Sequence, residues 1–180
     1  MRELSIKELI SAFGLCADIF AHPSDDYSKK VRYLGYLLGN EKLRDFSFSS
    51  DEIQSRYIKY FSLNASSYKT VPFASWWIDG KMMGKSFIRI GSFYKECGFE
   101  IDTINIKVPH DHISLMFSFV SIMLEDDRFF EAEKFMDNYL MWLKEFEDSL
   151  KKSSQTELFY ETVSISRDLI STFKILVKNL

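Results

Sequence analysis

The sequence contains few residues that break helices and few cysteines. Its 180 residues include 7 Gly and 3 Pro, and so few breakers in a chain of this length favour long helices over many short strands. The 2 cysteines, Cys16 and Cys97, form no Cys-x-x-Cys pair, so neither a disulfide framework nor a cysteine-rich zinc site is indicated. We expect both to be small buried hydrophobic residues.

An excess of positive charge is also missing, and so is a long apolar run. The formal net charge is -3, which argues against a general nucleic-acid binder because such proteins need clustered basic charge to neutralise phosphates. The richest apolar stretch, 113–124, is shorter than the roughly 18 residues that a membrane span requires. Residues 1–8 carry charges of both signs and do not look like a secretory signal. We expect a cytoplasmic protein without stable membrane insertion.

Apolar residues are plentiful, at 46% of the chain, and they are spaced for helices. Residues 6–20 follow the i, i+3, i+4, i+7 pattern of one helix face, and Ser5 with Glu8 predicts a capping box at its start. Similar patterns predict seven more helices. Four of them come before residue 100: from Ser24 or Asp25 to Leu38, where Gly39 ends the helix, at 41–46, from Ser50 or Asp51 to Phe61, and at 85–97. The other three are at 113–124, from Asp126 to Phe146 with Phe130 on the inner side, and around 159–173. The sequence therefore predicts an all-α, single-domain helical bundle over residues 1–180, with 113–124 as the central helix.

A long segment without helical periodicity interrupts this pattern. It runs from Asn64 to Gly84, and we expect a long aromatic loop between the central helices. A loop of about twenty residues in a compact domain is usually functional or disordered, and its aromatic content argues against disorder. If the backbone is extended, Trp76 and Trp77 point to opposite faces, so one is buried and the other exposed. An exposed aromatic side chain is a typical anchor for a peptide; the alternative is a hydrophobic loop that packs on the helices.

A second segment, 108–112, directly precedes the expected central helix. Pro109 opens that helix, and Asp111 is expected to cap its first-turn amides. His110 and His112 are too few for a zinc site, so no metal is expected. Asp111 could instead orient His112 as a catalytic base, but no activated serine or cysteine motif accompanies the pair.

Together the two segments resemble the TorD/DmsD/NarJ family of cytoplasmic chaperones for molybdenum-containing redox enzymes. The specific element of that family is Pro-x-Asp-His before an apolar helix, matched here by Pro109, Asp111 and His112. The loop match is looser, with Pro72, Ser75, Trp77, Asp79 and Gly80 at positions where the family tends to have proline, serine, an aromatic, an acidic or polar residue and glycine. Phe73-Ala74 and Val108 differ from the residues that the family commonly has at these positions. These differences leave undecided which redox enzyme the chaperone would serve. The resemblance covers roughly residue 53 to the end.

This resemblance implies a helical chaperone that binds the N-terminal leader of an apo-form molybdopterin oxidoreductase subunit. The leader has two adjacent arginines and an apolar stretch, and the chaperone holds it until the cofactor is inserted. The implied peptide-binding residues are Phe73, Ser75, Trp76, Trp77, Asp79, Pro109, Asp111 and His112. Asp79 and Asp111 are the candidates for the arginines, since carboxylates match guanidinium groups in a two-pronged geometry.

The chaperone itself is expected to catalyse no reaction and to need no cofactor. Gly80 and Gly84 are too few to indicate a phosphate-binding loop. The sequence is compatible with a monomer and with a dimer formed by exchange of helices. The alternative functions are a helical adaptor that binds another protein through a different face, or a hydrolase that uses the pair Asp111 and His112.

Overall fold

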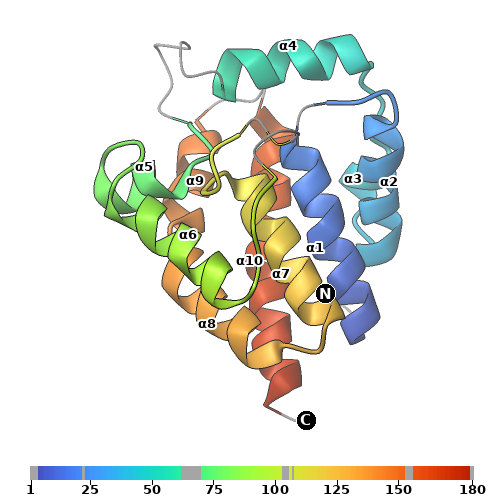
Figure 1. The fold of residues 1–180 in the computed structure, drawn as a ribbon. Helices are drawn as coiled ribbons and strands as arrows, with labels where there is room; N and C mark the ends of the chain where they lie inside the picture. The colour runs from blue at the N-terminus through green and yellow to red at the C-terminus, as the bar shows by residue number, and fades with distance from the viewer. Residues whose placement is uncertain are drawn as a thin grey trace.

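The chain folds into helices, as shown by a computed structural model that describes residues 4–21, 23–61, 70–102, 106, 108–152 and 156–178 (Figure 1). The helices are α1 (Ile6–Phe20), α2 (Tyr27–Leu38), α3 (Glu41–Arg44), α4 (Ser50–Phe61), α5 (Ala74–Asp79), α6 (Lys85–Glu96), α7 (Ile113–Glu125), α8 (Phe129–Tyr139), α9 (Leu143–Leu150) and α10 (Glu157–Val177). No strand occurs in these ranges, where an isolated bridge pairs Phe73 with His112. The expected all-α fold class is confirmed.

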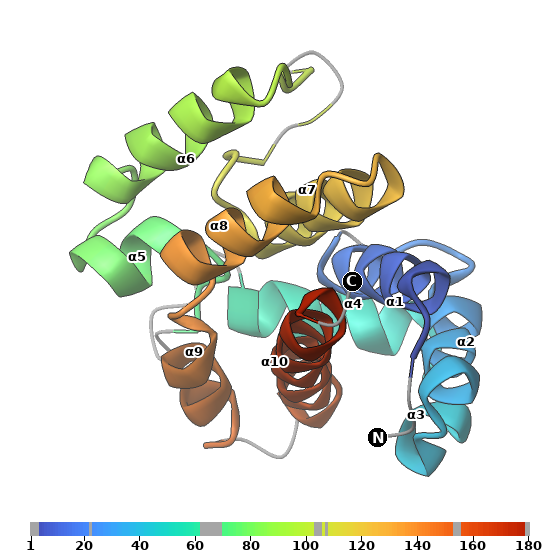
Figure 2. The same cartoon turned by 90° about the horizontal axis from the view of Figure 1, so that it is seen from below.

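Three long helices form the centre of the molecule. In both views α7 and α10 lie beside α1 (Figures 1 and 2), and α8 covers a further part of α7. The Phe20 ring at the end of α1 contacts one phenylalanine ring from each of four other helices, Phe61 in α4, Phe117 in α7, Phe146 in α9 and Phe159 in α10. Burying such a ring is worth about 1.5–3 kcal/mol. The prediction of 113–124 as a central helix is therefore confirmed.

The capping residues predicted at the helix ends agree with the structure in some places and lie one residue away from the observed ones in others. Ser5 and Glu8 form the expected capping box, and Gly39 ends α2 with a φ of 68°. The residue at the start of α2 is Asp26, whose side chain makes no capping hydrogen bond. At the start of α4, Ser49 and Glu52 exchange reciprocal hydrogen bonds. The N-cap of α2 is therefore Asp26 and not Ser24 or Asp25. The residue that caps the start of α4 is Ser49 and not Ser50 or Asp51.

The expected aromatic loop from Asn64 to Gly84 is wrong over residues 74–79, which form α5. Residues 62–69 lie outside the described part of the chain. The six residues of α5 are too few to show a periodic apolar face. Figure 1 shows α5 and α6 as a hairpin at one edge of the molecule.

The helix expected from Asp126 to Phe146 is in fact two helices, α8 and α9. Asp126 ends α7, and Asp127 has a φ of 57°, so the two aspartates form a turn before α8 begins. Between α8 and α9 the indole Nε1 of Trp142 donates to the carbonyl of Tyr139 at 2.8 Å. Phe130, expected on the inner side, is 74% exposed. The change of direction brings α9 against α10.

Within the described residues, no helix is both long and apolar enough to cross a bilayer. Those residues also contain no group of three or more histidine, cysteine or acidic side chains arranged to hold a metal ion.

Candidate functional site

The two segments singled out in the sequence lie side by side and are joined through their backbones. The N–H of Ala74 donates to the carbonyl of Asp111 at 3.0 Å, and the N–H of Ile113 donates to the carbonyl of Pro72 at 2.9 Å. These bonds flank the isolated bridge between Phe73 and His112. The start of α5 and the start of α7 are therefore fixed to each other.

The Asp111 side chain caps α5 and not α7, which corrects the expected role. Its Oδ2 accepts from the N–H of Ser75 in the first turn of α5, at 2.9 Å, where Phe73 at the N-cap offers no side-chain bond. Asp111 is completely buried, and its Oδ1 has no hydrogen-bond partner among the described residues. The N-cap of α7 is His112, whose Nδ1 accepts from the N–H of Ser114.

His112 is a buried, neutral residue and is not oriented by Asp111. Its Nδ1 lies 2.7 Å from the Ser114 hydroxyl and its Nε2 lies 3.5 Å from the Tyr57 hydroxyl. Burial lowers the pKa of His112 to about 3. A general base works best with a pKa near the operating pH, and the carboxylate of Asp111 binds Ser75. This arrangement does not have the geometry of the hydrolase alternative.

Trp77 turns toward α9 and stacks on a second indole. The rings of Trp77 and Trp142 are 6.4 Å apart and nearly parallel, at 11°, and Phe146 lies 5.7 Å from Trp77. The Nε1 of Trp77 donates to the carbonyl of Val71 at 2.8 Å. Trp76 and Trp77 are both half-buried, because neighbouring residues of a helix do not point to opposite faces as they do in a strand. The expected division into one buried and one exposed tryptophan is wrong.

Asp79 and Ser75 hold the turn between α5 and α6. The Oδ2 of Asp79 accepts from the N–H of Ser86 at 2.8 Å and from its hydroxyl at 2.6 Å, at the start of α6. Burial opposes ionisation of Asp79, but these hydrogen bonds and nearby cations lower its pKa. The hydroxyl of buried Ser75 accepts from the N–H of Met83 at 3.0 Å. Both carboxylates that were candidates for leader arginines thus already bind helix starts.

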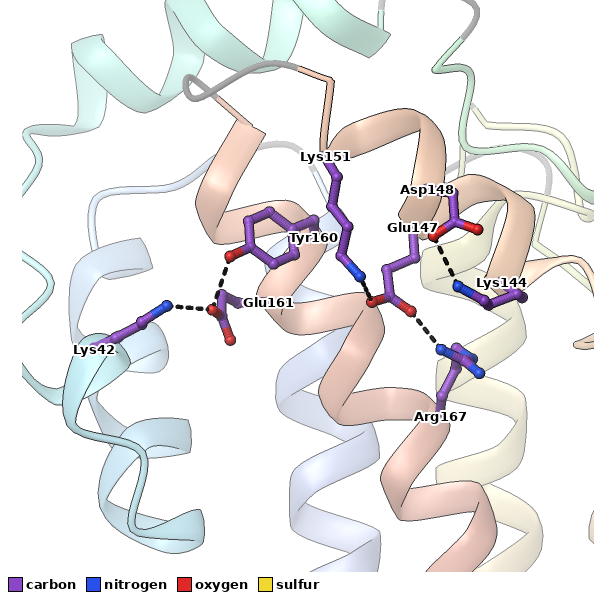
Figure 3. Close-up of polar contacts among 8 residues, drawn as sticks. All are labelled: Lys42, Lys144, Glu147, Asp148, Lys151, Tyr160, Glu161 and Arg167. Atoms are coloured by element: carbon purple, nitrogen blue, oxygen red, sulfur yellow. Dashed lines mark hydrogen bonds and ion pairs between the residues drawn. The ribbon is translucent and has the colours of Figure 1, made fainter.

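A charged cluster that the sequence analysis did not predict joins α9 to α10 (Figure 3). Glu147 is buried and its two oxygens lie 2.5 Å from Arg167 of α10 and 2.5 Å from Lys151. The i, i+4 spacing of Glu147 and Lys151 in the sequence would have predicted the ion pair between these two residues. By joining α9 to α10, the cluster keeps Trp142 beside Trp77.

The eight expected site residues fall into a buried group and a partly exposed group. Phe73, Ser75, Asp111 and His112 are buried, whereas Trp76, Trp77, Asp79 and Pro109 are partly exposed. The structure thus brings all eight to one region and leaves four of them accessible at its surface.

Comparison with known proteins gives two matches. The family model described as nitrate reductase delta subunit matches residues 33–153, more than half of the chain. A crystal structure from Archaeoglobus fulgidus, provisionally assigned as a redox enzyme maturation protein, superposes with a TM-score of 0.69 at 21% identity, and covers 93% of this chain and 97% of that chain. At this identity the structural match supports the fold alone. No curated protein sequence matches significantly.

Proposed function

The chain belongs to the nitrate reductase delta subunit family, a family of redox enzyme maturation chaperones and not of catalytic enzymes, and we propose that it binds the twin-arginine leader of a molybdopterin-containing oxidoreductase subunit. It acts in the cytoplasm on the apo-form of that subunit. It keeps the leader from export until the cofactor is inserted and the subunit has folded.

The single observation that carries this proposal is the joining of residues 71–80 to residues 108–112. The backbone bonds of Ala74 and Ile113 place an aromatic helix directly against the start of the central helix. The partly exposed Trp76 and Trp77 offer large rings at low cost in side-chain entropy, as peptide-binding surfaces commonly do. A net charge of -3 suits a cationic partner.

Within this proposal the eight residues have two kinds of role. Trp76, Trp77, Asp79 and Pro109 lie at the surface and contact the leader. Phe73, Ser75, Asp111 and His112 are buried and act as positioning residues, which hold α5 at the angle the leader requires.

The test is affinity purification of the tagged full chain from its own cells, followed by mass spectrometry of what co-purifies. We expect the precursor of an oxidoreductase subunit with its leader intact. Recovery of the same subunit without a leader, or of proteins that have none, would contradict leader binding and support the adaptor alternative.

A further inference from the structure

Positive charge is concentrated on the hairpin of α5 and α6, although the protein is acidic overall. Between Asp79 and Glu96 the chain has four cationic residues and no acidic one, whereas the whole chain has a formal net charge of -3. Figures 1 and 2 both show this hairpin at the edge of the molecule. The four cations are all exposed, and they are Lys81, Lys85, Arg89 and Lys95.

These four cations form no ion pair within the part of the chain that the structure describes. Asp79, the acidic residue that precedes them, binds the start of α6 through Ser86. Glu96 follows them at the end of α6. Even when these two acidic residues are included, the hairpin keeps an excess of positive charge that an external anion can neutralise.

Two large apolar side chains are exposed among the cations. Ile88 is 65% exposed and Met83 is 63% exposed. Lys85, Ile88 and Arg89 lie on one side of α6, because residues three and four positions apart are neighbours on a helix. Ile90, on the opposite side of α6, is completely buried. The helix therefore packs through its apolar side and presents a mixed cationic and apolar side to solvent.

The turn between α5 and α6 fixes Met83 at this surface. The N–H of Met83 donates to the hydroxyl of buried Ser75 at 3.0 Å, and Met83 has a φ of 54°, which is uncommon for a residue other than glycine. We name the exposed residues of the turn and of α6 the basic face. It consists of Lys81, Met83, Lys85, Ile88, Arg89 and Lys95.

From this arrangement we infer that the basic face docks the protein reversibly on an anionic lipid surface. Cationic side chains near a bilayer are attracted to its negatively charged headgroups, and apolar side chains on the same face enter the boundary between headgroups and acyl chains. The 12 residues of α6, about 18 Å long at about 1.5 Å per residue, lie along the bilayer and not across it. The inference goes beyond the proposed function and does not depend on it, since none of the six residues is assigned to the leader.

The combination of charge with exposed apolar side chains favours lipid over other partners. A nucleic acid would pair with the cations, but its contacts are mainly to phosphate oxygens and base edges and would leave Met83 and Ile88 in water. An acidic protein would have to supply a hollow that matches each of these side chains, whereas a bilayer accepts them without a matching shape. A second copy of the chain docked through the same face would bring the same cations together.

The experiment measures co-sedimentation of the full chain with two kinds of vesicle, one of phosphatidylglycerol and phosphatidylcholine in equal parts and one of phosphatidylcholine alone. The charge variant combines Lys85→Glu with Arg89→Glu. Its control combines Lys7→Glu with Lys29→Glu, which changes the net charge by the same amount at exposed positions of α1 and α2. Circular dichroism checks that each variant is folded.

We expect the wild-type chain to bind the anionic vesicles and not those of phosphatidylcholine alone, with binding that weakens as salt is added. Each cation near the surface is worth about fivefold in affinity, equivalent to about 1 kcal/mol, so the charge variant should bind at least about 25-fold more weakly. The control should stay closer to the wild type. No binding to the anionic vesicles, equal binding to both kinds, or equal losses in the charge variant and its control would overturn the inference.

A second pair of variants tests the apolar part of the basic face. Ile88→Ser should weaken binding to the anionic vesicles about tenfold, equivalent to about 1.4 kcal/mol. Ile58→Ser is the control, since Ile58 lies on α4 and is 53% exposed, and it should leave the affinity unchanged. Wild-type affinity in Ile88→Ser would mean that charge alone attracts the chain, as it would to any acidic partner, and would contradict docking into a bilayer.

Discussion

The carboxylate of Asp111, which directly precedes the N-cap of α7, accepts a hydrogen bond from the backbone N–H of Ser75 in the first turn of α5, at 2.9 Å. The two residues are 36 positions apart in the chain. Asp111, an acidic residue placed where it would be expected to cap the helix that follows it, thus caps a different helix, the one that carries Trp76 and Trp77. The Pro-x-Asp-His element is therefore a device that positions α5.

Replacing Asp111 separates this positioning role from direct contact with an arginine. Asp111→Ala removes the cap of α5 and should lower the free energy of unfolding by about 1 kcal/mol, measured by urea denaturation, and should weaken leader binding. Asp111→Asn keeps an oxygen that accepts from Ser75, so both stability and leader affinity should stay near those of the wild type. Loss of leader binding in a stable Asp111→Asn variant would show that the negative charge contacts the leader directly.

His112 should make the fold sensitive to mild acid. Its pKa is about 3 in the folded chain because it is buried, against about 6.5 when unfolded. Between these values the unfolded chain binds a proton that the folded chain does not, so stability falls as the pH decreases below about 6.5, by up to about 1.4 kcal/mol per pH unit. Denaturation midpoints at pH 6.5, 6 and 5.5, ~0.5 unit apart, would resolve this slope.

The matched variant for this prediction is His112→Asn, which keeps an acceptor for the N–H of Ser114 and cannot titrate. Its stability should decline less over the same pH interval. Equal slopes for the two proteins would show that His112 is not the group responsible.

Gly84 should resist substitution because of the side chain beside it. A Cβ at this position would overlap the carboxylate of Asp79, which must then leave Ser86 and uncap α6. We expect Gly84→Ala to lower the free energy of unfolding by about 1 kcal/mol. Gly14→Ala is the control, since its Cβ would lie an ordinary 3.5 Å from the Ser121 hydroxyl within α1, where alanine is the better helix former. Similar effects of the two changes would refute the role given to Asp79.

Glu147 should contribute more to stability than the acid next to it. Glu147→Gln weakens charge-assisted bonds to Arg167 and Lys151 at a buried position, which should cost about 1.5–3 kcal/mol in chemical denaturation. Asp148→Asn removes one half-exposed pair with Lys144 and should change stability little. The near-ultraviolet circular dichroism of the stacked Trp77 and Trp142 should also change in Glu147→Gln. An unaltered spectrum would mean that α9 is held in place by its apolar contacts alone.

The features that the sequence predicted correctly are those whose causes are local. The Ser5–Glu8 box and the left-handed Gly39 each depend on residues within one turn of the helix end. α5 was missed because its cap comes from Asp111, which no local pattern connects to Ser75. The break between α8 and α9 was missed because no proline or glycine marks it.

The same distinction applies to the site. Adjacent motifs indicated that residues 71–80 and 108–112 are important, and the structure joins them. Which side chains are buried, and that Glu147 meets Arg167 twenty positions later, depends on how whole helices pack.

The most direct test of the account is the affinity of the full chain for the isolated leader of its co-purifying precursor, compared with the same leader bearing glutamines for its two arginines. We predict one-to-one binding of the arginine leader and at least about tenfold weaker binding of the glutamine form, a difference of about 1.4 kcal/mol. Equal affinity for the two leaders, or no binding of either, would contradict recognition of a cationic, apolar leader by this fold.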